Sequence, residues 1–230
     1  MNTLILSIET STSACSVALH ENGQLIGTQM LTKEGSHSIK LTVLIDQLLE
    51  NCAVQMRDLS AIAVSNGPGS YTGLRIGLAT AKGLCFGLDI PLIALPTLQV
   101  LAKAYQGTTS PSIALLPMLD ARRMEVYSAI YQSDNFAELD SLKPVVLEEN
   151  SYAGLADKEI FAFGNGSSKF EAICQTKNIR FLKSPLYPEA KYMGELALES
   201  YLNQKFENIV TLEPQYLKEF VGTQPRKNIL

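Results

Sequence analysis

The chain has 230 residues, 46% of them hydrophobic, and a net charge of −4, which suits one large domain or two modest ones. The acidic balance gives no broad electrostatic attraction for nucleic acid and argues against a protein that binds RNA on its own. No stretch approaches the apolar length that spans a bilayer, so we expect no membrane contact.

The four cysteines, Cys15, Cys52, Cys85 and Cys174, are scattered along the chain. They lack the paired spacing of zinc and redox sites. They stand among apolar residues, which is typical of buried thiols in a reducing compartment. We therefore expect a cytoplasmic protein.

The first elements are three strands, predicted over residues 3–9, 14–20 and 24–31. Asn22-Gly23 is a strong signal for a two-residue hairpin between the last two. Residues 38–54 then form a helix with apolar residues at helical spacing, and Ile39 and Val43 lie off that stripe. A helix that is apolar on more than one side is either enclosed in its domain or keeps a side for a partner.

The central segment, residues 60–88, reads as a strand, a glycine-rich turn and a long apolar helix. Ser70 and Thr72 both suit the N-cap of this helix, whose free amide groups can hold an anion. Glycine and proline are also what a tight strand-to-helix turn requires, so a phosphate loop and a purely structural turn both stay open. The turn consists of Gly67, Pro68, Gly69, Ser70, Tyr71, Thr72 and Gly73.

The helix after the turn has an unusual face of small residues, because Gly73, Gly77 and Ala81 recur at every fourth position. Each glycine in a helix costs about 0.8–1 kcal/mol relative to alanine, so close packing must offset the cost. Two interpretations stay open. The face packs tightly on the chain's own sheet, or it admits the backbone of another chain.

The second half of the sequence repeats the plan of the first. A strand at 90–95 and a short helix from Thr97 to Tyr105 precede a polar linker, where we place the boundary between an N-terminal lobe, 1–106, and a reduced C-terminal lobe, 107–230. A strand ending in Asp120, a polar turn and an alternating strand follow, as they do around Glu9. Further strands at 136–147 and 159–163, helices at 167–174 and 188–202, and an extended tail complete the chain.

Three segments stand out together: Ile8-Glu-Thr-Ser-Thr-Ser-Ala-Cys-Ser-Val-Ala-Leu19, Ser65-Asn-Gly-Pro-Gly-Ser-Tyr-Thr-Gly-Leu-Arg-Ile-Gly77 and Asp120-Ala-Arg-Arg-Met-Glu-Val-Tyr127. They closely resemble the TsaB family, also known as YeaZ. The resemblance implies an α/β fold with two lobes, the ribonuclease H-like duplication of actin, sugar kinases and Hsp70, with a reduced second lobe. It also implies a non-catalytic partner of TsaD, the transferase that attaches a threonylcarbamoyl group to the adenosine beside the anticodon of certain tRNAs.

The resemblance further implies the partner surface. In this family the helices that correspond to residues 38–54 and 72–88 pair with TsaD, or with a second copy of the chain when TsaD is absent. The ATPase TsaE docks near that junction, and tRNA is engaged only through the complex. On this chain the expected interface residues are Ile39, Val43, Gly73, Leu74, Gly77, Leu78, Ala81 and Leu84.

The resemblance also bears on catalysis. A catalytic relative such as TsaD carries a metal-holding His-x-x-x-His pair after the strand that corresponds to residues 90–95. Here residues 94–100 contain no imidazole and no carboxylate, whereas a divalent metal needs several such ligands. We predict no catalytic residue, no metal and no cofactor beyond weak nucleotide binding. His20 and His37, the two histidines of the chain, are expected to be solvated or capping residues.

The runner-up hypothesis is an enzyme of the same fold, either a stand-alone ATP-dependent phosphotransferase or a metallopeptidase. In that case Glu9 and Asp120 would face magnesium and phosphate from the ends of corresponding strands. The competing interpretation is that both carboxylates hold the turn that follows them. Arg122-Arg123 likewise either contacts phosphate or forms a solvated turn.

Overall fold

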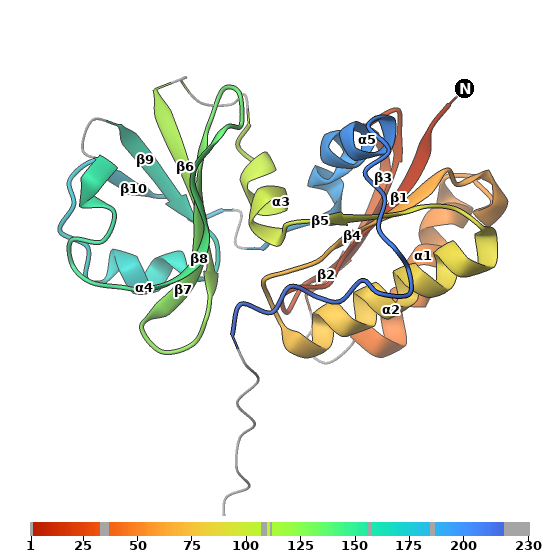
Figure 1. Ribbon diagram of the computed structural model, residues 1–230, viewed down its shortest axis with the longest axis horizontal. Helices are drawn as coiled ribbons and strands as arrows, with labels where there is room; N and C mark the ends of the chain where they lie inside the picture. Colours follow the sequence, from red (N-terminus) through yellow and green to blue (C-terminus); the bar gives the residue numbers. More distant parts are fainter. Residues whose placement is uncertain are drawn as a thin grey trace, which may run out of the picture.

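A computed structural model describes residues 2–32, 37–106, 110, 112–155, 158–184 and 187–218. Figure 1 shows two lobes side by side, each built on a twisted sheet of five strands. The predicted two-lobed α/β architecture is therefore confirmed. Among the described residues, no helix combines the length and the apolar character that a bilayer crossing requires.

The first sheet has the strand order β3-β2-β1-β4-β5. Its strands are β1 (Leu4–Glu9), β2 (Cys15–Glu21), β3 (Gln24–Leu31), β4 (Ala61–Ser65) and β5 (Leu92–Leu95). The first three form the predicted antiparallel meander, and β4 and β5 add in parallel. Asn22 and Gly23 adopt φ values of 51° and 80°, the left-handed conformation that a two-residue hairpin requires.

Two long helices, α1 (His37–Asn51) and α2 (Tyr71–Leu88), cover one face of this sheet (Figure 1). The short helix η1 (Met56–Asp58) lies between them in the chain. Both long helices bury leucines and small residues against the apolar side chains of β1, β2 and β4. The core of the first lobe includes Leu41, Ile45, Leu48, Leu78, Ala81 and Cys85 from the helices and Ile8, Val17 and Ile62 from the strands.

The second sheet repeats the first, because its order β10-β9-β6-β7-β8 is the same topology. Its strands are β6 (Ile113–Asp120), β7 (Glu125–Gln132), β8 (Glu138–Val146), β9 (Glu159–Phe163) and β10 (Ile179–Phe181), accompanied by η2 (Ala153–Leu155) and α4 (Ser167–Glu171). The strand β10 is too short to give a sequence signal. The lobe is reduced because α4 has 5 residues, whereas α1 and α2 have 15 and 18.

The packing divides the chain differently from the predicted boundary at residue 106. The helix α3 (Thr97–Lys103) places Leu98 and Leu101 in a core of the second lobe. The segments η3 (Ala190–Tyr192) and α5 (Gly194–Leu202) return to the first lobe and cover the second face of its sheet. Apolar burial thus decides lobe membership, and each lobe includes a segment from the other half of the sequence.

Residues 207–218, which we call the C-terminal strap, run along α2 and reach the second lobe (Figure 1). The backbone of Glu207 bridges to Leu92, and Lys82 donates a hydrogen bond to Leu212 O at 2.6 Å. Tyr216 stacks on Tyr71 with ring centroids 4.8 Å apart. The predicted extended tail is therefore anchored over its described length.

Candidate functional site: the glycine loop and the α1–α2 surface

The glycine-rich turn joins β4 to α2 as predicted, and a hydrogen bond holds each end of it. Gly67 N donates to Thr97 Oγ1 at 3.1 Å, and Gly67 has a φ of 115° that favours glycine. Ser70 is the N-cap, since its hydroxyl accepts a hydrogen bond from Gly73 N at 3.2 Å. Thr72, the other N-cap candidate, lies inside the helix.

The small residues of this loop and of the first turns of α2 accommodate the chain's own β1–β2 turn. A Cβ atom added to Gly69 would lie less than 3 Å from Ser11, and one added to Gly73 or Gly77 equally close to Thr10. Thr10 Oγ1 donates to Gly73 O at 2.9 Å, and Ser70 N donates to Ser11 O at 2.6 Å. The loop glycines are thus explained by close intramolecular packing, as the structural-turn interpretation requires.

The predicted interface therefore needs a correction on α2. Gly73, Leu74, Gly77, Leu78 and Ala81 are all buried, so a partner cannot reach them. Leu84 is half-buried and packs against the core of the first lobe. The physical reason is that the β1–β2 turn and the sheet already fill the small-residue face.

The two predicted residues on α1 lie at the surface. Ile39 is 70% exposed and Val43 is 42% exposed. On α2 the outward side instead carries Phe86, which is 80% exposed, and the small residues Ala79, Gly83 and Gly87. A Cβ atom added to Gly83 or Gly87 would meet nothing within 4 Å. We call Ile39, Val43, Ala79, Gly83, Phe86 and Gly87 the α1–α2 surface.

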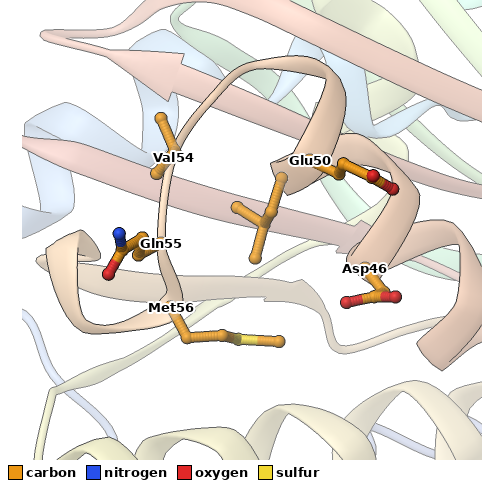
Figure 2. A pocket seen from close by; sticks show the side chains of 6 residues that line it. Asp46, Glu50, Val54, Gln55 and Met56 are labelled. Atoms are coloured by element: carbon orange, nitrogen blue, oxygen red, sulfur yellow. The ribbon is translucent and has the colours of Figure 1, made fainter.

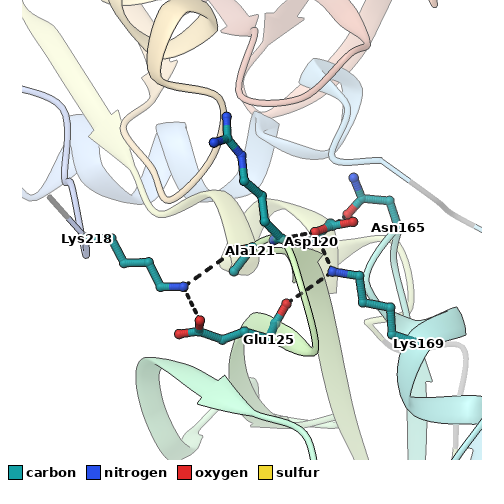
Figure 3. A network of polar contacts seen from close by, with 7 residues as sticks. Asp120, Ala121, Glu125, Asn165, Lys169 and Lys218 are labelled. Carbon is teal, nitrogen blue, oxygen red and sulfur yellow. Dashed lines mark hydrogen bonds and ion pairs between the residues drawn. The ribbon is translucent and has the colours of Figure 1, made fainter. Parts of the chain in front are cut away.

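Glu9 and Asp120 hold corresponding turns in the two lobes. Glu9 Oε1 accepts a hydrogen bond from Ser11 N at 2.6 Å, and Asp120 Oδ1 accepts one from Arg122 N at 2.6 Å. Each carboxylate thus bonds the amide two residues ahead, as predicted for turn-holding acids. Glu9 is fully buried, and burial raises its pKa. Asp120 also forms an ion pair with Lys169 (Figure 3).

The segment after β5, residues 96–100, contains no histidine and no carboxylate that could hold a metal. Thr97 Oγ1 is used by the glycine loop, and Leu98 and Val100 are buried in apolar cores. Across the described residues, no three His, Cys, Asp or Glu side chains converge as metal ligands. The prediction that His20 is a solvated or capping residue is wrong. Its side chain is buried, with Nδ1 3.1 Å from Ser7 Oγ and Nε2 3.2 Å from Lys191 O. The side chain of His37 lies outside the described residues.

Two surface hollows accompany the helices. The first, of about 420 Å³, lies at the end of α1 and is lined by Asp46, Leu49, Glu50, Val54, Gln55 and Met56; Figure 2 shows its lining side chains. The second, of about 340 Å³, lies between α2 and the C-terminal strap, with Arg75 and Lys82 on its wall. Neither brings the glycine loop together with Glu9 or Asp120.

Comparison with known proteins finds relatives that cover nearly the whole chain. The family model described as "TsaD: tRNA N6-adenosine threonylcarbamoyltransferase" matches residues 32–221. The tRNA threonylcarbamoyladenosine biosynthesis protein TsaB of Haemophilus influenzae is 31% identical over 96% of this chain and 95% of that protein. TsaB of Escherichia coli is 30% identical over 95% of this chain and 96% of that protein.

Solved structures agree with these relatives. The structure described as YeaZ from Pseudomonas aeruginosa superposes with a TM-score of 0.81 at 28% identity, and covers 94% of this chain and 100% of that one. Sequence and fold point to the same group of proteins. The chain belongs to the TsaB (YeaZ) family of tRNA threonylcarbamoyladenosine biosynthesis proteins, within the broader group that the TsaD model describes.

Proposed function

We propose that this chain is a non-catalytic subunit of tRNA threonylcarbamoyladenosine biosynthesis that binds and supports a TsaD-like catalytic subunit through the α1–α2 surface. The observation that carries the proposal is the exposure of Phe86 and Ile39 on the two helices that cover one face of the first sheet. Aromatic side chains, phenylalanine among them, are enriched in the buried cores of protein interfaces. The open positions Gly83 and Gly87 let a partner helix approach the backbone of α2 closely.

The same surface accounts for the other expected partners. An apolar surface that loses its partner can pair with a second copy of itself, so we propose a homodimer in the absence of the TsaD-like subunit. A TsaE-like ATPase would then join the assembled pair. We place the complex in the cytoplasm, supported by four unpaired cysteines. Burial raises the pKa of Cys15 and of Cys85 to about 11, so both thiols resist ionisation.

The non-catalytic assignment is supported by the chemistry of the described side chains. Glu9 and Asp120 hold turns, and the segment after β5 offers no metal ligand. A phosphotransferase or metallopeptidase would need side chains free to hold a metal ion or a phosphate. Measurement of ATP turnover and of bound metal on the purified chain separates the hypotheses, because the subunit proposal requires both to stay at background.

The direct test is co-purification with the cognate TsaD-like subunit. Burying a phenylalanine side chain stabilises by about 1.5–3 kcal/mol, so Phe86→Ala should weaken pairing by about 10- to 100-fold. Val146→Ala is the matched control, since Val146 is 67% exposed on β8 of the other lobe. Equal affinities for the two variants would refute the α1–α2 surface. A modification assay that proceeds without this chain would refute the subunit role itself.

A further inference from the structure

The turn between β6 and β7 carries two arginines in a backbone conformation that arginine rarely adopts. Arg122 and Arg123 have φ values of 68° and 47°, in the left-handed region that glycine and asparagine occupy at lower cost. Both side chains are exposed. Asn-Gly would adopt this conformation with less strain. Because backbone strain of this kind concentrates at functional sites, it points to a function for the positive charge of the two arginines.

The neighbouring charged side chains pair with one another and leave Arg122 and Arg123 without a paired carboxylate. Asp120 pairs with Lys169 at 2.6 Å, and Glu125 pairs with Lys218 of the C-terminal strap (Figure 3). Lys218 also donates to Ala121 O at 3.4 Å, and Asn165 accepts a hydrogen bond from Asp120 N at 3.0 Å. Two separate segments, residues 165–169 and the C-terminal strap, thus hold the turn from outside.

Each nearby carboxylate is therefore used by a lysine. Within the described part of the chain, neither the Arg122 nor the Arg123 guanidinium has a hydrogen bond or an ion pair. Four cationic and two anionic side chains gather at this turn, so it carries two unpaired positive charges on a chain whose net charge is −4.

The corresponding turn of the first lobe shows that the basic character is not required by the fold. Residues 10–13 connect β1 to β2 in the same topological position, contain no charged residue and pack under the glycine loop. Glu9 and Asp120 hold the two turns by the same hydrogen bond. The exposed β6–β7 turn thus carries two arginines, whereas the β1–β2 turn that packs under the glycine loop carries none.

We propose that Arg122 and Arg123 bind RNA phosphates, namely those of the tRNA held by the assembled complex. This inference rests on the function proposed above and adds a direct RNA contact to it. The planar guanidinium matches phosphate geometry with paired hydrogen bonds. An exposed hairpin tip suits the open backbone of a polyanion better than a small anion, which needs an enclosing site.

The experiment compares tRNA binding by the complex of this chain with its TsaD-like subunit. The test variant is Arg122→Asn with Arg123→Gly, which suits the left-handed turn and should leave the melting temperature unchanged or raised. Each lost phosphate contact lowers the slope of log affinity against log salt by about 0.7–0.9. We expect the slope to fall by about 1.4–1.8 and the affinity at 0.1 M salt to fall by at least about tenfold.

The matched control removes the same charge elsewhere, through Lys177→Gln with Lys205→Gln, two exposed lysines with no described side-chain partner. An unchanged slope in the test variant, or an equal loss in the control, would overturn the phosphate site. Subunit pairing is measured in the same samples. Pairing that fails with the unaltered chain refutes the proposed function, whereas pairing that persists while RNA binding ignores the arginines refutes this inference alone.

Discussion

The helix α2 offers two glycines, Gly77 and Gly83, at which the same substitution should have opposite effects. Alanine gains about 1 kcal/mol over glycine in a helix interior at either position. At Gly83 the new methyl group meets open space, so Gly83→Ala should stabilise the chain by about that amount. At Gly77 it would lie less than 3 Å from Thr10 Oγ1.

To make room for a methyl group at position 77, the Thr10 side chain has to move and give up its buried hydrogen bond to Gly73 O. Overpacking costs about 1–3 kcal/mol and the lost bond about 0.5–1.5 kcal/mol. After the helix gain is subtracted, Gly77→Ala should destabilise the chain by about 0.5–3.5 kcal/mol. For a chain of this size each kcal/mol shifts the melting temperature by about 2–4 °C.

Thermal unfolding of the two variants, followed by circular dichroism, measures the difference directly. We expect a higher melting temperature for Gly83→Ala and a lower one for Gly77→Ala. The reasoning fails if both substitutions raise the melting temperature, because Gly77 would then not be in close contact with Thr10. Subunit pairing adds a second readout, since a larger side chain at Gly83, such as leucine, should weaken pairing without loss of fold.

Two further predictions concern the buried acid and the C-terminal strap. Burial raises the pKa of Glu9 above its ordinary value of 4.5, so Glu9 is more protonated in the folded than in the unfolded chain between its two pKa values, and its contribution to stability falls as pH rises through that window. The stability difference between Glu9→Gln and the unaltered chain should therefore shift in favour of the variant as pH rises above 4.5, and a constant difference in urea titrations would contradict this. Tyr216→Ala removes the stack on Tyr71, worth about 0.5–1.5 kcal/mol, and should speed hydrogen exchange at Gln215 N, which donates to Asn66 O. Tyr216→Phe keeps the stack and is the control; equal exchange in the two variants would show that the ring does not anchor the strap.

Much of the fold was predictable because its signals are local. Asn22-Gly23 predicted the hairpin that forms, and Glu9 and Asp120, each after an apolar strand, revealed the repeated plan of the two lobes. The turn-holding role of these acids followed from the preference of carboxylates for an amide two residues ahead. The two residues of the interface predicted on α1, Ile39 and Val43, lie at the surface because each stands off its helix's apolar stripe.

The candidate interface on α2 was harder to predict, because the helix carries two sets of small residues, each with its members four positions apart. Gly73, Gly77 and Ala81 form one set, and Ala79, Gly83 and Gly87 form the other. The spacing in the sequence is the same for both sets. Only the position of the β1–β2 turn shows that Gly73 and Gly77 of the first set are covered by Thr10, whereas Gly83 and Gly87 of the second set face open space. Phe86 was the sequence signal for the exposed side of α2, because it is an aromatic residue on the side of the helix opposite to the leucines.

The amino-acid sequence by itself determined most of the elements, the duplication and the family, because strand alternation, helical spacing and turn residues depend on neighbours in the chain; the three-residue strand β10 gave no such signal. The tertiary structure alone decided which faces are buried, how α3, α5 and the strap cross between the lobes, and which charges near Arg122 are paired. These features depend on contacts between residues as far apart as Glu125 and Lys218. Local patterns do not encode such pairings, because the two partners are far apart in the chain and meet only in the folded structure.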